Sequence, residues 1–334
     1  MDRVIIIAEA CQNHNGQLKK AYQLVDVAKK CGADFVKFQT SIPKLHISKF
    51  AQQANYQIKN WKKKSNQLEM IQKISLTYDD FIKIKKYCKK KKIEFLSTPF
   101  DLNSIDFLKS LNMKYFKIPS GEITNLPYLI KVAKLKKKVI LSTGMANLTE
   151  IRDALKILNS YGTLKKNITI LQCNTEYPTP LKDANIKAML TIKKKFKINV
   201  GYSDHTQGIE SSLAAVALGA KVLEKHITLD KKLPGPDHKA SVNPEELKKM
   251  VEGIRKISIA LGSGVKKVSS SERKNITIAR TSIVASKFIK KGEKFTNKNL
   301  TIKRPGNGIS PMKLFKVIGK IAKKKFLEDE LIKL

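Results

Sequence analysis

The sequence predicts an α/β protein: a (β/α)₈ TIM barrel at residues 1–264, followed by a small second domain. Eight short runs rich in β-branched and aromatic residues recur along the first three-quarters of the chain, and helical patterns separate them. This alternation is typical of a parallel sheet, and eight such units indicate a closed barrel. The chain has 334 residues, 42% of them hydrophobic. A barrel takes about 250 residues, so a small extra module fits the remainder.

The expected strands are residues 4–8, 35–39, 94–97, 115–118, 139–142, 168–172, 198–202 and 222–226. Apolar residues at helical spacing predict helices over 21–32, 151–162 and 211–220, the first of which ends at Gly32. No GxGxxG follows the first strand, which argues against a dinucleotide-binding fold. Residues 41–75 form one long connection, and we interpret it as a functional loop or lid.

The chain changes character after residue 264. Residues 265–276 are polar and rich in lysine, so we expect a linker there. Residues 277–334 contain short strand patterns, Lys-Gly-Glu and Pro-Gly turns and one late helical piece. We therefore expect a small independent domain over 277–334.

The net charge of +38 comes mostly from lysines dispersed along the whole chain. A nucleic-acid surface is one interpretation of this charge. We favour lysine as a generic solvated residue, because no aromatic platform or nucleic-acid-binding motif accompanies it. The apolar run at the N-terminus is too short for a signal peptide, and no stretch approaches a membrane span. Four scattered cysteines without metal-site spacing suit a cytoplasmic enzyme.

Polar residues close or follow every expected strand. Active-site residues of (β/α)₈ barrels lie at the C-terminal ends of the strands, so eight polar ends together predict one site. The residues in question are Glu9, Lys37, Gln39, Ser97, Thr98, Lys117, Ser120, Glu122, Ser142, Thr143, Asn174, Thr175, Glu176, Ser203, Asp204, His205 and His226.

Two lysines, Lys37 and Lys117, stand inside otherwise apolar strands. Burial of a lone charge is costly, so we interpret them as a clamp for a phosphate or carboxylate. Lysines that extend to the barrel rim are the alternative. Glu9 and Glu122 are the carboxylates best placed to bind sugar hydroxyls or move protons. Alternatively, they serve as partners of the two lysines.

Two of the five histidines close consecutive strands. Because neighbouring strands lie about 4.8 Å apart, His205 and His226 could reach one divalent cation. A pair of hydrogen-bonded rim histidines is the alternative. We expect His14 to brace a loop and His46 to lie on the surface. His238 is a candidate third ligand, which we rank below Asp237.

The chain resembles the N-acetylneuraminate (sialic acid) synthase family. The matching motifs run from residue 7 to residue 310: IAEA…NHNG, VKFQT, STPFD, FKIPSGE, LSTGM, NTEYPTP, GYSDHT, LEKHIT, GPDHKAS and KRPGNGIS. The resemblance implies condensation of phosphoenolpyruvate with N-acetylmannosamine and water, which gives N-acetylneuraminate and phosphate. A legionaminic acid synthase, using 2,4-diacetamido-2,4,6-trideoxymannose, is the alternative, and a pseudaminic acid synthase ranks lower.

The resemblance also implies roles for individual residues. His205 and His226 would hold the divalent ion, Mn²⁺ first and Mg²⁺ or Co²⁺ as alternatives, and His226 would be catalytic with Glu9 and Glu122. Some members have CTN before YPTP, where this chain has Cys173, Asn174 and Thr175. The contact with phosphoenolpyruvate at this position would therefore be made by either Thr175 or Asn174. The implied substrate-binding residues are Lys37, Gln39, Thr98, Phe100, Lys117, Ser120, Ser142, Thr175, Tyr177, Ser203, Asp237 and Arg304.

The C-terminal domain resembles type III antifreeze protein, the SAF fold. In the family it reaches over the barrel of a partner subunit, so the resemblance implies a domain-swapped homodimer in which Arg304 contacts the sugar's N-acyl group. The expected partners are therefore the two small substrates and a second copy of the chain, with no membrane and no nucleic acid. A charge-driven nucleic-acid binder and an inactive barrel are the rival interpretations from other classes.

Overall fold

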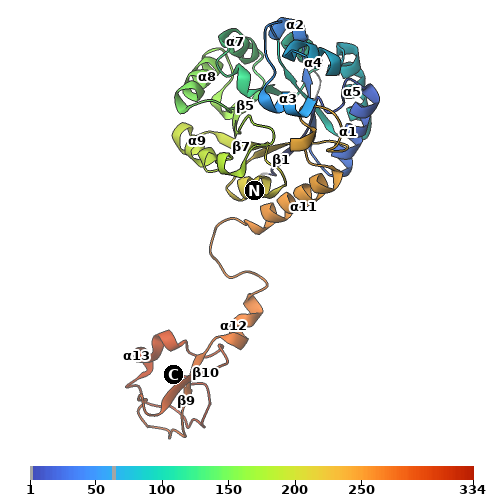
Figure 1. The fold of residues 1–334 in the computed structure, drawn as a ribbon. Helices are drawn as coiled ribbons and strands as arrows, with labels where there is room; N and C mark the ends of the chain where they lie inside the picture. The colour runs from blue at the N-terminus through green and yellow to red at the C-terminus, as the bar shows by residue number, and fades with distance from the viewer. Residues whose placement is uncertain (1–2, 62–64) are drawn as a thin grey trace. The chain divides into compact units, whose positions relative to one another are not determined.

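The computed structural model describes residues 3–61 and 65–334. The chain divides into two compact units, residues 1–263 and 264–334. Figure 1 looks into the first unit and shows a ring of strands with helices around it. This arrangement confirms the predicted (β/α)₈ barrel.

Eight parallel strands form the sheet in the order β3-β2-β1-β8-β7-β6-β5-β4, and β3 lies beside β4 without ladder hydrogen bonds between them. The first strand pairs with the last, which nearly closes the barrel. The strands are β1 Ile5–Cys11, β2 Phe35–Thr40, β3 Glu94–Pro99, β4 Tyr115–Ile118, β5 Lys138–Ser142, β6 Ile168–Gln172, β7 Asn199–Asp204 and β8 Val222–His226.

Three strands run two or more residues further than the sequence predicts. Strand β1 continues past residue 8 to Cys11, and β3 and β7 continue to Pro99 and Asp204. The cause is the ladder itself, in which Glu9 pairs with both Lys37 and His226. Some polar residues expected to follow the strands are thus paired within the sheet, and this pairing fixes the direction of their side chains.

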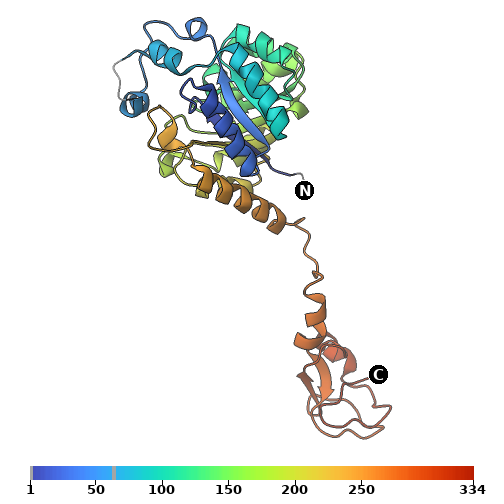
Figure 2. The same cartoon turned by 90° about the vertical axis from the view of Figure 1, so that its right-hand side faces the viewer.

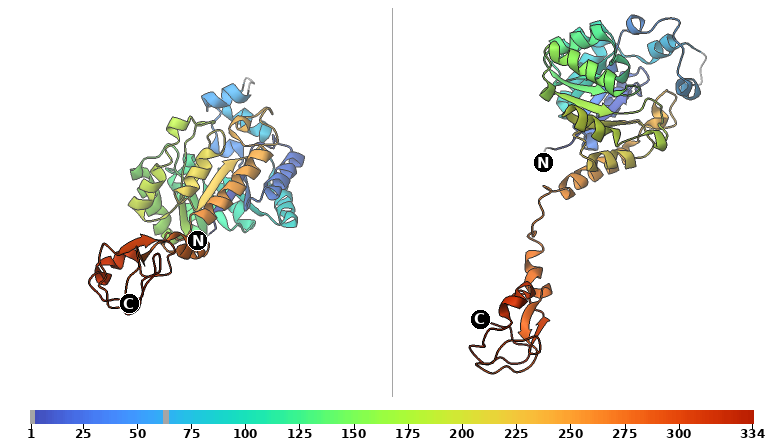
Figure 3. Two further views of the ribbon diagram at one scale, coloured as in Figure 1. Left: turned by 90° about the horizontal axis from the view of Figure 1, so that it is seen from below. Right: turned by 90° about the vertical axis from the view of Figure 1, so that its left-hand side faces the viewer.

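Helices cover the outside of the ring, as the two views of Figure 3 show. Helix α8 (Leu148–Ser160) begins before the predicted residue 151, because Asn147 and Glu150 form a capping box. Its apolar residues at helical spacing face the core. The other covering helices are α1 Leu18–Lys30, α5 Tyr78–Lys91, α6 Leu102–Ser110, α7 Leu126–Lys134, α9 Ala188–Phe196, α10 Glu210–Ala217 and α11 Pro244–Ala260.

The long connection after β2 contains three helices in its described part: α2 (Pro43–His46), α3 (Asn55–Trp61) and α4 (Gln67–Ile74). Figure 2 shows this segment, in light blue, at one end of the barrel. Trp61, Met70 and Ile74 form a small core of their own. The segment is therefore a folded wall at the barrel's end.

The second unit contains helix α12 (Arg273–Ala279), the antiparallel strands β9 (Ser282–Ala285) and β10 (Leu300–Lys303), and the short helix α13 (Leu314–Val317). Phe295 and Phe326 pack edge to face in its core. Residues 273–276, which the sequence places in the linker, form the start of α12. That helix is bound to the small unit, because the Gly306 amide donates to the Thr277 carbonyl at 2.7 Å.

Among the residues that the structure describes, no helix has both the length and the apolar character needed to cross a membrane. The four cysteines, all of which lie in the described part, are buried free thiols.

Candidate active site

A cavity of about 450 Å³ opens at the C-terminal ends of the barrel strands. Every residue predicted to bind substrate or metal or to act in catalysis, except Arg304, lines it. These residues are Glu9, Lys37, Gln39, Thr98, Phe100, Lys117, Ser120, Glu122, Ser142, Thr175, Tyr177, Ser203, His205, His226 and Asp237. Five of the polar residues at strand ends, Ser97, Thr143, Asn174, Glu176 and Asp204, do not line the cavity. Residues from α3 and α4 complete the wall. Parallel strands bring their C-terminal ends to one rim, so scattered sequence positions meet in one place.

A buried network of charges forms the floor of the cavity. The Lys117 ammonium donates to Glu224 Oε1 at 2.9 Å, and Lys37 Nζ lies 3.4 Å from Glu224 Oε2. Lys37 also pairs with Glu9, whose other oxygen accepts from the Cys11 amide at 2.7 Å. The two lysines are therefore not lone charges, contrary to the expectation from the sequence, because Glu9 and Glu224 pair with them.

Glu224 is the most important residue that the sequence reasoning missed. It lies two positions before His226 in β8, so strand alternation sends both side chains into the barrel. That period of two was the available signal. Burial opposes ionisation of Glu224, but the ammonium groups of Lys117 and Lys37 outweigh it and hold its pKa below the usual range. Burial lowers the pKa of Lys37 to about 7, with Glu224 opposing the shift.

Hydroxyl groups surround the two ammonium groups. Thr98 accepts from Lys37 at 3.1 Å, and Ser203 donates to Glu224 at 3.0 Å. Ser120 accepts from the Gly144 amide at 2.9 Å. The buried Ser142 hydroxyl finds no hydrogen-bond partner within the described residues. A buried donor without a partner is uncommon and leaves this group available to a bound anion.

His205 and His226 lie side by side, with ring centroids 5.2 Å apart. The Nδ1 atom of His205 contacts the Asn174 carbonyl oxygen, so it carries the proton and leaves Nε2 with the lone pair. Burial lowers the pKa of His205 to about 4. Burial and the neighbouring His205 also lower the pKa of His226. Both rings are thus neutral near pH 7, the form that binds a cation.

Aromatic rings enclose the two histidines. Tyr177 stacks on His205 at a centroid distance of 4.2 Å and contacts Tyr56 of α3 at 5.1 Å. His46 lines the cavity and packs against Phe100 at 5.7 Å. The prediction that His46 lies on the surface was therefore wrong. The reason is that the connection after β2 folds over the barrel's end.

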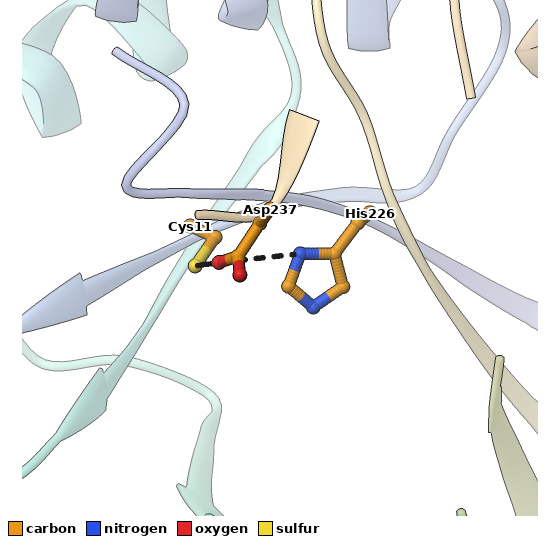
Figure 4. A group of neighbouring side chains, drawn as sticks. All are labelled: Cys11, His226 and Asp237. Atoms are coloured by element: carbon orange, nitrogen blue, oxygen red, sulfur yellow. Dashed lines mark hydrogen bonds and ion pairs between the residues drawn. The ribbon is translucent and has the colours of Figure 1, made fainter. Parts of the chain in front are cut away.

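Cys11, Asp237 and His226 form a close group at the edge of the cavity (Figure 4). The Cys11 thiol donates to Asp237 at 2.8 Å, and the same carboxylate oxygen lies 4.0 Å from His226 Nδ1. Burial raises the pKa of Asp237 to about 6, although the thiol's hydrogen bond opposes the shift. The sequence reasoning treated Cys11 as a scattered thiol, because no motif spacing joins it to residues more than 200 positions away.

The remaining predicted residues occupy definite places. Glu122 is half-buried and accepts from Asn125 at 2.6 Å, and burial raises its pKa. Thr175 lines the cavity, whereas the Asn174 side chain accepts from the Glu176 amide at 2.8 Å. Of the two alternatives at that position, Thr175 is the one that faces the cavity.

Two other histidines serve the loops next to the site. The Gly16 amide donates to His14 Nδ1 at 3.1 Å, which fits the expected loop brace. His238 contacts Thr228 at 2.7 Å and does not line the cavity, so it is not placed as a ligand there. Arg304 lies exposed in the second unit, just after β10.

The NeuB family matches residues 24–266, and the SAF domain matches residues 280–334. The chain belongs to the NeuB family. This membership confirms the resemblance drawn from the motifs and agrees with the barrel followed by a small domain. NeuB-family membership makes the protein a sugar-acid synthase, and a divalent cation fits its paired neutral histidines.

Three similar proteins indicate where in the NeuB family the chain stands. It is 56% identical over 333 residues to N,N'-diacetyllegionaminic acid synthase of Campylobacter jejuni subsp. jejuni, with 100% of both chains covered. It is 45% identical to the protein of that name from Legionella pneumophila, over 94% of this chain and 89% of that one. The crystal structure of a sialic acid synthetase from Leptospira borgpetersenii has a TM-score of 0.73 at 34% identity, covering 82% and 90% of the two chains.

Proposed function

We propose that this enzyme condenses phosphoenolpyruvate with 2,4-diacetamido-2,4,6-trideoxymannose and water to give N,N'-diacetyllegionaminic acid and phosphate. The observation that carries the proposal is the 56% identity, over the full length of both chains, to a synthase of that product. It favours the second of the two acceptors that the sequence suggests. N-acetylmannosamine, the first, has support from a relative at 34% identity.

The floor of the cavity suits phosphoenolpyruvate, which carries a phosphate and a carboxylate. Lys37 and Lys117 supply two ammonium groups in a buried setting, where charge-assisted hydrogen bonds are strong. We propose that Thr98, Ser142 and Ser203 donate further hydrogen bonds to the same anion. Glu9 and Glu224 hold the ammonium groups in place and compensate their charge until the substrate arrives.

A divalent cation fits the two neutral histidines. The carbonyl contact on Nδ1 of His205 is the arrangement that orients a metal-binding imidazole through its other nitrogen. We propose that His205 and His226 hold the ion, with Mn²⁺ first among the alternatives. When bound, such an ion supplies Lewis-acid polarisation of the sugar's aldehyde oxygen.

In the proposed reaction, the C3 carbon of phosphoenolpyruvate attacks the aldehyde carbon, and one C–C bond forms. The aldehyde's C=O π bond opens, and its oxygen takes up a proton to become a hydroxyl group. Water adds at C2 and gives up one proton; its second proton leaves as the C2 keto group forms and the C2–O bond to phosphate breaks. The lysines keep the anion oriented while charge develops. We propose that Glu122, whose pKa burial raises, holds or moves a proton at the cavity wall. Gln39, Phe100, Thr175, Tyr177 and Asp237 would face the sugar.

The acceptor is tested by incubating the purified protein with phosphoenolpyruvate and each amino-sugar in turn. We expect kcat/KM for the diacetamido sugar to exceed that for N-acetylmannosamine at least tenfold, measured by phosphate release and mass spectrometry of the product. The reverse preference would establish the sialic acid reaction instead. No product from either sugar would reject both.

The affinity for phosphoenolpyruvate should fall as the pH rises above 7. In the free site the pKa of Lys37 is about 7, because burial disfavours its ammonium form. At higher pH the lysine must take up a proton to bind the anion, so KM should rise, up to about tenfold per pH unit. Steady-state kinetics from pH 6.5 to 9 measure this. Lys37→Arg keeps its charge and should flatten the profile. A flat wild-type profile would contradict the prediction.

We also infer a homodimer in which Arg304 reaches the N-acyl group of the sugar in the partner's barrel. The resemblance and the SAF match support this inference. Light scattering of the purified chain measures the dimer. A cytoplasmic location is proposed from the four free thiols, since disulfides are rare in that compartment.

A further inference from the structure

Three ligand-type side chains from distant parts of the chain meet beside the proposed substrate site. Cys11 ends β1, His226 ends β8 and Asp237 lies in the loop after β8 (Figure 4). Each offers a donor atom, and these atoms lie within 4.8 Å of one another. We propose that Cys11, Asp237 and His226 form a separate binding site for a soft divalent cation such as Zn²⁺.

Two of the three separations lie within about half an ångström of the spacing that a small tetrahedral ion requires. Zn²⁺ binds sulfur at about 2.3 Å and nitrogen or oxygen at about 2.0–2.2 Å, so two of its ligands lie roughly 3.3–3.8 Å apart. The separations of 2.8 Å from sulfur to carboxylate and 4.0 Å from carboxylate to imidazole lie on either side of that range. As the sulfur–metal bond forms, the thiol proton leaves to solvent. A fourth position stays open to water.

The imidazole of His226 provides a second observation that points to a ligand. His226 is 4% exposed, and its Nδ1 has no hydrogen-bond partner among the residues described. Buried polar atoms of this kind nearly always have a partner. In Figure 4 this nitrogen points toward the Asp237 carboxylate. A cation between the two groups would satisfy both.

The backbone at Cys11 also marks the position as unusual. Cys11 has a φ of 47°, and the β1–β2 register shifts between Glu9 and Cys11. Residues other than glycine rarely adopt this backbone conformation, because the Cβ atom is crowded there. Such irregularities occur where a strand directs a side chain into a site.

The thiol in this donor set gives the site a preference for soft metal ions, which the site formed by His205 and His226 lacks. Thiolate ligands favour Zn²⁺ and other soft ions over Mg²⁺ and Mn²⁺. The two sites share His226, and a neutral imidazole has one lone pair on one nitrogen. Occupation of the thiol site through Nδ1 would therefore remove His226 from the pair with His205. A soft cation bound at the thiol site would therefore inhibit the enzyme. This consequence rests on the proposed function, in which His226 and His205 hold the catalytic cation.

Cobalt titration of the full-length, metal-free protein tests the site directly, because a thiolate bound to Co²⁺ gives a charge-transfer absorption band in the near ultraviolet. We expect this band in the wild type, its loss in Cys11→Ser and its retention in Cys173→Ser, which alters a thiol that lines the cavity outside the proposed ligand set. Added Zn²⁺ should bleach the band. No band in the wild type, or a band that persists in Cys11→Ser, would overturn the proposal.

A second variant keeps the test decisive if Cys11→Ser does not fold, as judged by circular dichroism. Asp237→Asn retains the thiol, so the cobalt band should remain while the affinity for Co²⁺ falls at least tenfold. Unchanged affinity would contradict the assigned ligand set.

Activity provides a separate measurement. The Zn²⁺ concentration that half-inhibits the Mn²⁺-supplied enzyme should rise at least tenfold in Cys11→Ser compared with the wild type. Equal sensitivity of the two proteins would reject inhibition through this site. A cobalt band in a protein that makes no sugar acid would reject the proposed function and leave the cation site standing.

Discussion

Replacing His226 with alanine should lower phosphate release from phosphoenolpyruvate about a thousandfold. His226 lines the cavity, next to His205 and 4.0 Å from the Asp237 carboxylate. Its loss would remove a ligand of the proposed cation and with it several kcal/mol of transition-state stabilisation, and each 1.4 kcal/mol is a factor of ten. A coupled phosphate assay with both substrates saturating measures the change.

His238→Gln is the matched control for this variant. His238 is also buried, yet it contacts Thr228 and does not line the cavity. The His238→Gln variant should keep its activity within about tenfold of the wild type, because His238 is not a ligand of the proposed cation. Metal analysis of both variants should show reduced Mn²⁺ binding in His226→Ala alone. Turnover by His226→Ala close to the wild-type rate would rule out the assignment.

Replacing Lys225 with methionine should destabilise the barrel by about 3–5 kcal/mol, the usual cost of removing one partner of a buried ion pair. Lys225 and Asp204 are 0% exposed, and their charged groups lie 2.9 Å apart. Without the ammonium group, Asp204 stays buried with hydroxyl and amide donors alone. Urea unfolding measures the change, followed by fluorescence of Trp61, the single tryptophan of the chain.

A surface ion pair supplies the comparison. Lys131 and Asp106 lie 2.6 Å apart, with side chains 29% and 63% exposed, so Lys131→Met should cost no more than about 1 kcal/mol. Similar losses in Lys225→Met and Lys131→Met would mean that burial does not set the strength of the Lys225 pair.

Much of the site could be predicted from the sequence, because a parallel barrel obeys simple geometric rules. A residue at the end of a strand is carried to the common rim whatever its position in the chain, which is why Lys37, Thr98 and Ser203 line one cavity. The two histidines at the ends of consecutive strands likewise become neighbours. Motifs spread over the chain identified the family. Strand ends and motifs can both be recognised in the sequence without knowing which residues are in contact.

The pairing of the buried charges could not be predicted, because it depends on which side chains face each other across neighbouring strands. Alternation along β8 turns Glu224 into the cavity, where it joins Lys37 and Lys117, and turns Lys225 outward against Asp204. The sequence shows five charged residues in four strands, but only the register between strands determines which pairs form. The exact partners of a buried charge depend on distances of a few ångströms, and local patterns do not contain them.

The sequence by itself determined the barrel, the rim and the polar strand-end residues that line the cavity, since strand periodicity and chain order suffice for these. Phe100, Tyr177 and Asp237 came from the family resemblance. The tertiary structure alone decided that His46 belongs to the wall and that Cys11 lies against Asp237 and beside His226. Such groups come from segments separated by up to 226 positions. Their meeting follows from the closure of β1 onto β8 and from the path of the connecting loops, which no local sequence pattern specifies.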